Sequence, residues 1–105
     1  MKTLDLILKL EGVIEDNLLN PDEVLITIVN YPNVSTLSSN GIWIGDQIQL
    51  SNTQGGRLNT AQMLIDVLVM NKSKQVTIQD HSNIKLDVRY NKFNDSISIQ
   101  SRQTI

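Results

Sequence analysis

The stretch that decides the fold is VLITIV, residues 24–29, in which apolar residues follow one another with almost no alternation. Side chains of a strand point alternately to its two faces, so a strand with one solvated face alternates apolar and polar residues. A short continuous apolar run indicates instead a strand that is buried on both faces. Turn sequences bound it, NPD at residues 20–22 and YPN at residues 31–33. We therefore expect residues 24–29 to form the central strand of a sheet.

Two segments have the apolar spacing of amphipathic helices that would cover such a sheet. The first spans residues 4 to about 19, with Thr3 as its predicted N-cap. Gly12 within it would allow a close approach to a strand. The second spans residues 60 to about 71, with Thr60 as its predicted N-cap. Its apolar stripe is wide, so we expect this helix to be well buried, with its methionines filling the core.

The remaining apolar segments predict strands. Asn40-Gly41 is a strong hairpin signal, so residues 34–38 and 42–50 are expected to pair across it. Within the second arm, Gly45-Asp46 marks a bulge or a short turn. Three further strands are expected after the second helix, at residues 75–79, 84–90 and 97–99.

The predicted order is thus helix, three strands, helix, three strands. A mostly antiparallel sheet with one apolar face, covered by two helices, is a stable two-layer α+β arrangement. At 105 residues the chain has the size of a single domain, residues 1–105. Residues 1–52 and 57–102 would be two copies of one αβββ unit if the chain arose by duplication. The Thr-Ile pairs at residues 27–28 and 77–78 are the only sequence sign of such a repeat.

The composition excludes several kinds of chemistry. The chain has no cysteine, which removes disulfides, thiol catalysis, iron–sulfur clusters and cysteine zinc sites. His81 is the only histidine and lies in a polar stretch beside Asp80 and Ser82, so neither a catalytic triad nor a transition-metal site is expected. We predict no catalytic residues, no metal and no cofactor, and hence a non-enzymatic protein. The absence of a signal-peptide pattern and of a membrane-length apolar run favours the cytoplasm.

Charge is distributed unevenly along the chain. Residues 1–52 carry seven acids and two bases, a net charge of −5, whereas residues 53–105 carry seven bases and four acids, a net charge of +3. This asymmetry reflects either solvated faces or an acidic and a basic face used in a head-to-tail or partner contact. The pI of about 5.1 gives no broad positive field, which disfavours nucleic-acid binding.

One loop carries the pattern of an anion site. In SNTQGGRLNTAQ, residues 51–62, two glycines and an arginine precede the predicted second helix. A helix N-terminus presents free N–H groups to anions, glycines admit close approach, and arginine grips phosphate bidentately. The P-loop and Rossmann patterns are both absent, so the loop is either a plain connection or an anion site of another kind. The candidate residues for this anion site are Gly55, Gly56, Arg57, Asn59, Thr60, Lys85 and Arg89. Lys85 and Arg89 are on one face of a predicted strand, and they could complete the site only if another subunit covers that face.

Trp43 is the main interface candidate. Its side chain is expected on the strand face opposite to Ile42 and Ile44, which should face the core together with Ile48 and Leu50. Trp43 is therefore either core in a sheet covered on both faces or an exposed anchor, and tryptophan is enriched at the energetic centres of interfaces. The full set of interface candidates is Trp43, Tyr31, Glu15 and Asp16.

These patterns favour a small, cytoplasmic, non-enzymatic binding protein that occupies the surface of a partner protein. The thin aliphatic core favours self-association, most simply as a homodimer. Ala61 is the only alanine, while Asn and Ile are abundant, a composition that suggests a phage or mobile-element product and an inhibitor of host defence. The alternative is a homo-oligomeric binder that captures a phosphorylated small molecule or a nucleotide at Gly55-Gly56-Arg57.

Overall fold

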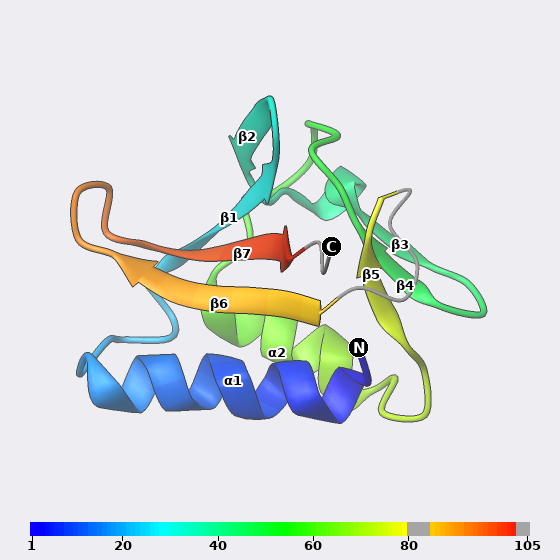
Figure 1. Cartoon of the computed structure of the whole chain (residues 1–105), viewed down its shortest axis with the longest axis horizontal. Coiled ribbons are helices and arrows are strands. Elements are labelled where there is room, and N and C mark those ends of the chain that lie inside the picture. The colour runs from blue at the N-terminus through cyan, green and yellow to red at the C-terminus, as the bar shows by residue number, and fades with distance from the viewer. Residues whose placement is uncertain (80–84, 103–105) are drawn as a thin grey trace.

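The computed structural model describes residues 1–79 and 85–102, and within them the chain folds as an α+β structure of two α-helices and seven strands (Figure 1). In chain order the elements are α1 (Thr3–Asp16), β1 (Leu25–Asn30), β2 (Asn33–Thr36), β3 (Ile42–Ile44), β4 (Ile48–Leu50), α2 (Ala61–Val69), β5 (Val76–Ile78), β6 (Lys85–Asn91) and β7 (Ser96–Arg102). The α+β class is confirmed, and the order matches except that the arm expected at residues 42–50 forms two strands. The single domain and the duplication stay predictions.

β1 is the central strand that VLITIV predicts, and it is paired along both edges. It runs parallel to β7 on one side and antiparallel to β2 on the other, in a four-stranded sheet of order β2-β1-β7-β6. Beyond the end of β2, the segment before α2 takes over the same edge. Asn59 O accepts a hydrogen bond from the Ile26 N–H at 3.3 Å. Val24 O accepts one from the Ala61 N–H at 2.9 Å.

A second sheet, of order β3-β4-β5, divides the single sheet that we expected. In it β4 runs antiparallel to β3 and parallel to β5. The predicted hairpin across Asn40-Gly41 is wrong, because β2 and β3 lie in different sheets and Ser39–Gly41 form a 3-10 turn between them. A Cβ on Gly41 would lie 2.7 Å from the Ser51 carbonyl oxygen. The glycine therefore serves a close approach of two backbones rather than the positive φ of a hairpin turn.

Both helices pack on one face of the four-stranded sheet, and the second sheet closes one end of the molecule (Figure 1). The interior is almost wholly aliphatic and is shared by both helices and both sheets. Its fully buried members include Leu6, Leu10, Ile26, Ile28, Leu50, Leu64, Ile78 and Ile97. A single core thus joins all four groups of elements.

The start of α1 differs from the sequence prediction. Lys2 takes the N-cap place, and Thr3 is the first helical residue. Thr3 is fully buried, and its Oγ1 donates to Lys74 O at 2.6 Å, so the hydroxyl ties α1 to the segment before β5. Gly12 makes no close approach to a strand either, since a Cβ there would meet nothing within 4 Å.

The start of α2 agrees with the prediction. Thr60 is the N-cap, and its Oγ1 accepts from the Met63 N–H at 3.3 Å. The burial of this helix is less complete than expected, because Met70 is largely exposed just beyond its end. In the described part of the chain, neither helix has the length and apolar character needed to cross a membrane.

Ile28→Ala should lower the free energy of unfolding far more than Ile44→Ala, although both residues are strand isoleucines. Ile28 is fully buried in β1, so truncation leaves a cavity in the core and should cost about 2–5 kcal/mol. Ile44 in β3 is 54% exposed, so its truncation should cost less than about 1 kcal/mol. Urea unfolding followed by circular dichroism measures both changes. Equal losses would contradict the central position of β1.

Candidate functional site

The two glycines of the candidate anion loop are explained by the fold. Gly55 and Gly56 have φ angles of 123° and 80°, which other residues rarely adopt. Both also lie against the 3-10 turn: Gly55 O accepts from the Asn40 N–H at 3.1 Å, and a Cβ on Gly56 would overlap the Ser39 side chain. The Ser39 hydroxyl in turn accepts from the Arg57 N–H at 3.0 Å. The loop is therefore a fitted connection between β4 and α2.

The start of α2 directs its backbone donors to the protein itself. The acceptors of its first four N–H groups are Val24 O for Ala61, Pro21 O for Gln62, Thr60 Oγ1 for Met63 and Thr60 O for Leu64. Asn59 is buried, and its side chain donates to Arg57 O at 3.3 Å. An anion at this helix start would have to displace these bonds. The phosphate-site interpretation thus loses the free donors on which it depends.

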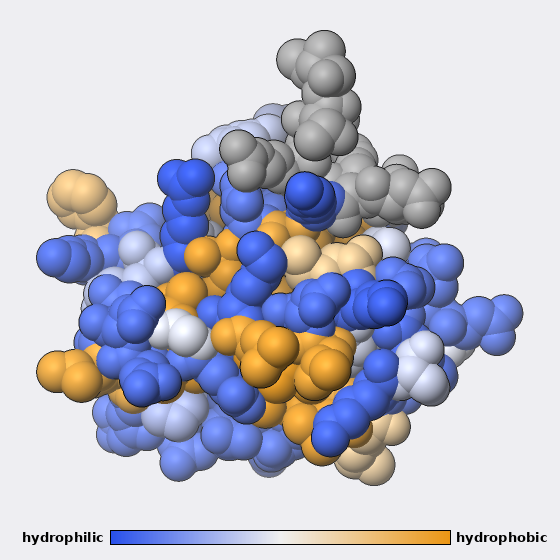
Figure 2. Space-filling view, turned by 60° about the horizontal axis from the view of Figure 1, so that its bottom comes forward, coloured by the Kyte–Doolittle hydropathy of each residue, from blue (hydrophilic) through white to orange (hydrophobic). Residues whose placement is uncertain are grey.

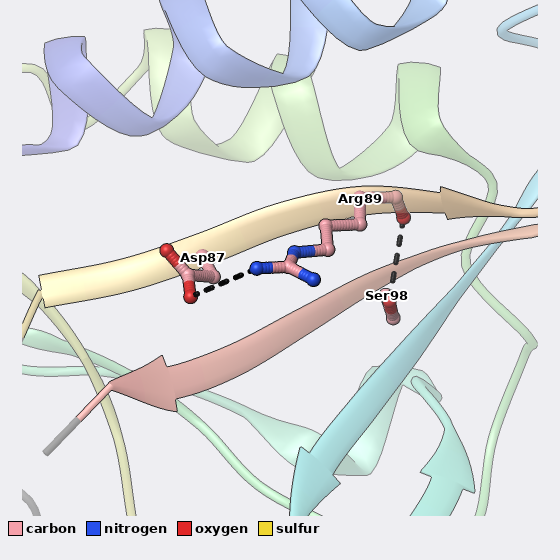
Figure 3. A network of polar contacts seen from close by, with 3 residues as sticks. All are labelled: Asp87, Arg89 and Ser98. Carbon is pink, nitrogen blue, oxygen red and sulfur yellow. Dashed lines mark hydrogen bonds and ion pairs between the residues drawn. The ribbon is translucent and has the colours of Figure 1, made fainter.

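The basic residues grouped with this loop lie apart. Arg57 is exposed beside the 3-10 turn, whereas Lys85 and Arg89 are on β6, the edge of the four-stranded sheet opposite to β2. Figure 3 shows the Arg89 side chain lying toward Asp87, with Nη2 and Oδ2 3.9 Å apart, while Ser98 Oγ donates to Arg89 O at 3.3 Å. The guanidinium is 80% exposed, so this pair is a weak, solvated surface contact. The structure does not bring the seven candidate residues into one site.

The most prominent apolar exposure in a strand is at β3. Trp43 is 60% exposed and Ile44 is 54% exposed. β3 stands at the end of its sheet among the described strands, so only β4 pairs with it. Of the two alternatives for Trp43, the structure therefore selects the exposed one. Ile44 was expected in the core and is not, because Ile48 and Leu50 lie one strand further in and are fully buried instead.

Two shallow pockets flank β3. Because side chains alternate, Trp43 points to the face opposite to Ile44. The first pocket, of about 420 Å³, lies between β3 and α2 and is lined by Ile42, Ile44, Met63, Asp66 and Val67. The second, of about 410 Å³, surrounds the β3–β4 turn and shares Ile44 with the first; it is lined by Trp43, Ile44, Gly45, Asp46, Gln47 and Gln49. We call them the α2 pocket and the tryptophan pocket, and together with β3 they form the β3 surface.

The β3 surface has a negative character. Asp66 lines the α2 pocket and Asp46 lines the tryptophan pocket, whereas no Lys or Arg of the described chain lines either one. Asp66 is exposed and accepts from Gln62 Nε2 at 2.8 Å. One base among the described residues contacts this surface: Lys74 Nζ donates to Gly45 O at 2.6 Å, next to Asp46, and fixes the β3–β4 turn. This turn, at Gly45-Asp46, is the short turn that the sequence predicts.

Sequence reasoning found Trp43 but missed Ile44, Asp46, Met63 and Val67. Met63 and Val67 belong to the wide apolar stripe from which we expected a well-buried helix, and both are only half-buried, at the α2 pocket. The sequence feature that could have revealed this exposure is the width of the apolar stripe. Apolar positions that extend past the core face of a helix reach its flank, where a second surface has to cover them.

The other interface candidates lie away from the β3 surface. Tyr31 is exposed at the β1–β2 turn, and Glu15 and Asp16 are exposed at the end of α1, across the molecule from β3 (Figure 1). Apolar surface also gathers on the helix side of the molecule (Figure 2), and Leu4 and Leu8 of α1 are exposed. Helix backbones satisfy their own hydrogen bonds, so the exposed residues of α1 offer a partner side chains but no unpaired strand backbone.

Titratable groups elsewhere form no metal cluster in the residues described: no three or more His, Asp or Glu side chains gather there to hold an ion. Tyr90 Oη donates to Asp95 Oδ1 at 2.6 Å, which raises the pKa of that phenol and closes the β6–β7 turn. His81, with Asp80 and Ser82, lies outside the described residues. That the chain has no catalytic residues stays a prediction.

Gly56→Ala should destabilise the protein, whereas Gly12→Ala should stabilise it slightly. An alanine at position 56 would have to adopt a φ of 80° and would overlap Ser39, so we expect a loss of about 1–3 kcal/mol in the free energy of unfolding. At position 12 a Cβ meets nothing, and helix propensity favours alanine by about 1 kcal/mol. Urea unfolding measures both. If the two variants shifted stability in the same direction, the fit of the loop against the 3-10 turn would be refuted.

Comparison with known proteins provides no relative from which a role could be transferred. No protein family model, no curated protein and no solved structure matches the chain. The functional argument therefore rests on the geometry of this molecule.

Proposed function

We propose that this chain acts by binding a partner protein through the β3 surface, without catalysing a reaction. The observation that carries the proposal is the exposure of Trp43 and Ile44, which are neighbours on an edge strand and lie beside two pockets. Complete burial of an apolar side chain contributes about 1.5–3 kcal/mol, and the isolated chain forgoes more than half of it at both positions, because Trp43 is 60% and Ile44 is 54% exposed. A partner that covers them would recover it.

The surroundings of Trp43 support an interface rather than a chance exposure. Gln47, Gln49 and Asp46 lie around it and provide the polar rim that protein interfaces have around an aromatic anchor. The hairpin that carries it is held in place, because Lys74 Nζ bonds to Gly45 O and the Ser51 N–H bonds to Gly41 O. An anchor on a fixed element loses less conformational entropy on binding.

The alternative function, capture of a phosphorylated small molecule at Gly55-Gly56-Arg57, receives no support from the start of α2, whose donors are bonded within the chain. The narrower expectations for this protein remain predictions from sequence: a phage-type inhibitor, a cytoplasmic location and a homodimer. Binding through the β3 surface requires none of them.

Trp43→Ala should abolish capture of the partner without loss of the fold. The immobilised chain is incubated with lysate of its source cells, and retained proteins are quantified by mass spectrometry. Loss of a central tryptophan anchor lowers affinity by about 30-fold or more, equivalent to about 2 kcal/mol. The free energy of unfolding should change by less than about 1 kcal/mol, because the side chain is 60% exposed.

Phe93→Ala is the matched control, because Phe93 is a fully exposed aromatic residue in the β6–β7 turn, outside the β3 surface. A double reversal, Glu15→Lys with Asp16→Lys, tests the end of α1 in the same way. Both variants should retain the partner. Equal retention by Trp43→Ala, or loss only in the controls, would refute binding at the β3 surface, as would the absence of any specific partner.

A further inference from the structure

We infer that the occupant of the β3 surface is an extended segment of the partner that pairs with the free edge of β3 and alternates apolar with basic side chains. This inference rests on the proposed function and adds the conformation and the chemistry of the bound segment. It follows from the backbone of β3, from the pockets on its two faces and from the carboxylates that line them.

The backbone of Ile44 faces the free edge of the sheet. In an antiparallel pair, residues that exchange hydrogen bonds alternate with residues that do not. Two bonds fix the pattern here, from the Ser51 N–H to Gly41 O at 2.8 Å and from the Gly45 N–H to Gln47 O at 3.0 Å. Trp43 and Gln49 are paired midway between these bonds, so they belong to the bonded set. The N–H and C=O of Ile44 therefore point away from β4.

The edge presents a short, defined set of backbone groups. The Ile42 N–H donates to Ser39 O within the 3-10 turn, so it is already used. Three backbone groups are then left at the free edge: one donor, the Ile44 N–H, and two acceptors, Ile42 O and Ile44 O. An extended peptide can meet this set with its own backbone, whereas a helix has no free backbone groups along its sides. The edge therefore selects a strand as its occupant.

The pockets specify the side chains of that strand. Successive side chains of an added strand would go alternately to the two faces of β3. On one face they would enter the α2 pocket, where Ile44, Met63 and Val67 provide an aliphatic lining. On the other face they would lie over the indole of Trp43 beside Asp46. A Lys or Arg there gains both a cation–π contact and an ion pair.

The charge of the surface disfavours a second copy of this chain as the occupant. Two copies paired through β3 would bring Asp46 and Asp66 of one copy toward Asp46 and Asp66 of the other. Lys74, bonded to Gly45 O, is the one base that the described contacts place at this surface, so the surface carries two carboxylates for each base. A basic segment gains from the same carboxylates. The negative charge of the β3 surface agrees with the sequence, in which no Lys or Arg lies between Lys9 and Arg57. Charge complementarity thus commits the site to a basic strand from another protein.

Selection of a random peptide library displayed on phage against the full chain tests this chemistry without assuming a sequence. Enriched peptides should carry Lys or Arg at every second position, with aliphatic residues between them, and should bind more weakly at high salt. Asp46→Lys should weaken such a peptide by about tenfold while leaving the fold intact. Enrichment of acidic peptides, of amphipathic helical peptides or of none would overturn the inference.

Hydrogen exchange of the complex with one enriched peptide tests the pairing itself. The peptide should slow exchange of the Ile44 amide and change the Trp43 amide little, because the latter is already bonded to β4. Ile44→Ala keeps the backbone donor and should weaken binding by less than about tenfold. Ile44→Pro removes the donor at an edge position that tolerates proline, and it should abolish binding. Equal binding by the two variants would exclude edge pairing.

The two proposals fail in different ways. If Trp43→Ala loses a protein partner from lysate but no strand peptide is enriched, the proposed function stands and the partner binds through a folded surface. If Trp43→Ala loses no partner, the proposed function fails and this inference fails with it.

Discussion

The rest of the structure depends on the pairing of β1 along both of its edges. β7 supplies one edge, and β2 followed by Asn59 supplies the other. A buried strand must have partners for its backbone groups on both sides, because each unpaired group would cost about 1–3 kcal/mol. Segments from both halves of the chain therefore return to this one strand. The start of α2 is fixed by the segment that leads into β1, since Val24 O and Pro21 O accept its first two N–H groups.

This arrangement leaves β3 with one partner. The backbone leaves the β1 sheet at the 3-10 turn and pairs with it again at Asn59, and between these points it forms the β3–β4 hairpin. One strand of the hairpin, β4, joins β5, and the other becomes the edge. Trp43 and Ile44 then lie where the core does not reach. The candidate site is thus located at a part of the fold that contributes little to its stability.

Local patterns in the sequence predicted the helices and most of the strands. They could not predict which strands pair, because pairing joins segments that are far apart in the chain. The burial of residues 24–29 and the capping of α2 by Thr60 depend on neighbouring residues, and both were predicted. The parallel pairing of β1 with β7 joins segments far apart in the chain and has no local signature. For Trp43 the alternation identified a face but could not say whether anything covers it. At the start of α2, the first two N–H groups looked free because their acceptors, Val24 O and Pro21 O, lie about forty residues earlier in the chain.

An exposed edge strand invites pairing with other chains, and β3 limits that hazard with the features that would make it selective. It has only three residues, it ends at the Gly45-Asp46 turn, and Ser39 already occupies one of its donors. Short edges and nearby charges are common protections against edge-to-edge association. Asp46 adds a charge that repels a like copy and attracts a basic strand. The same residues thus restrict self-association at β3 and define the chemistry of the segment that β3 can accept.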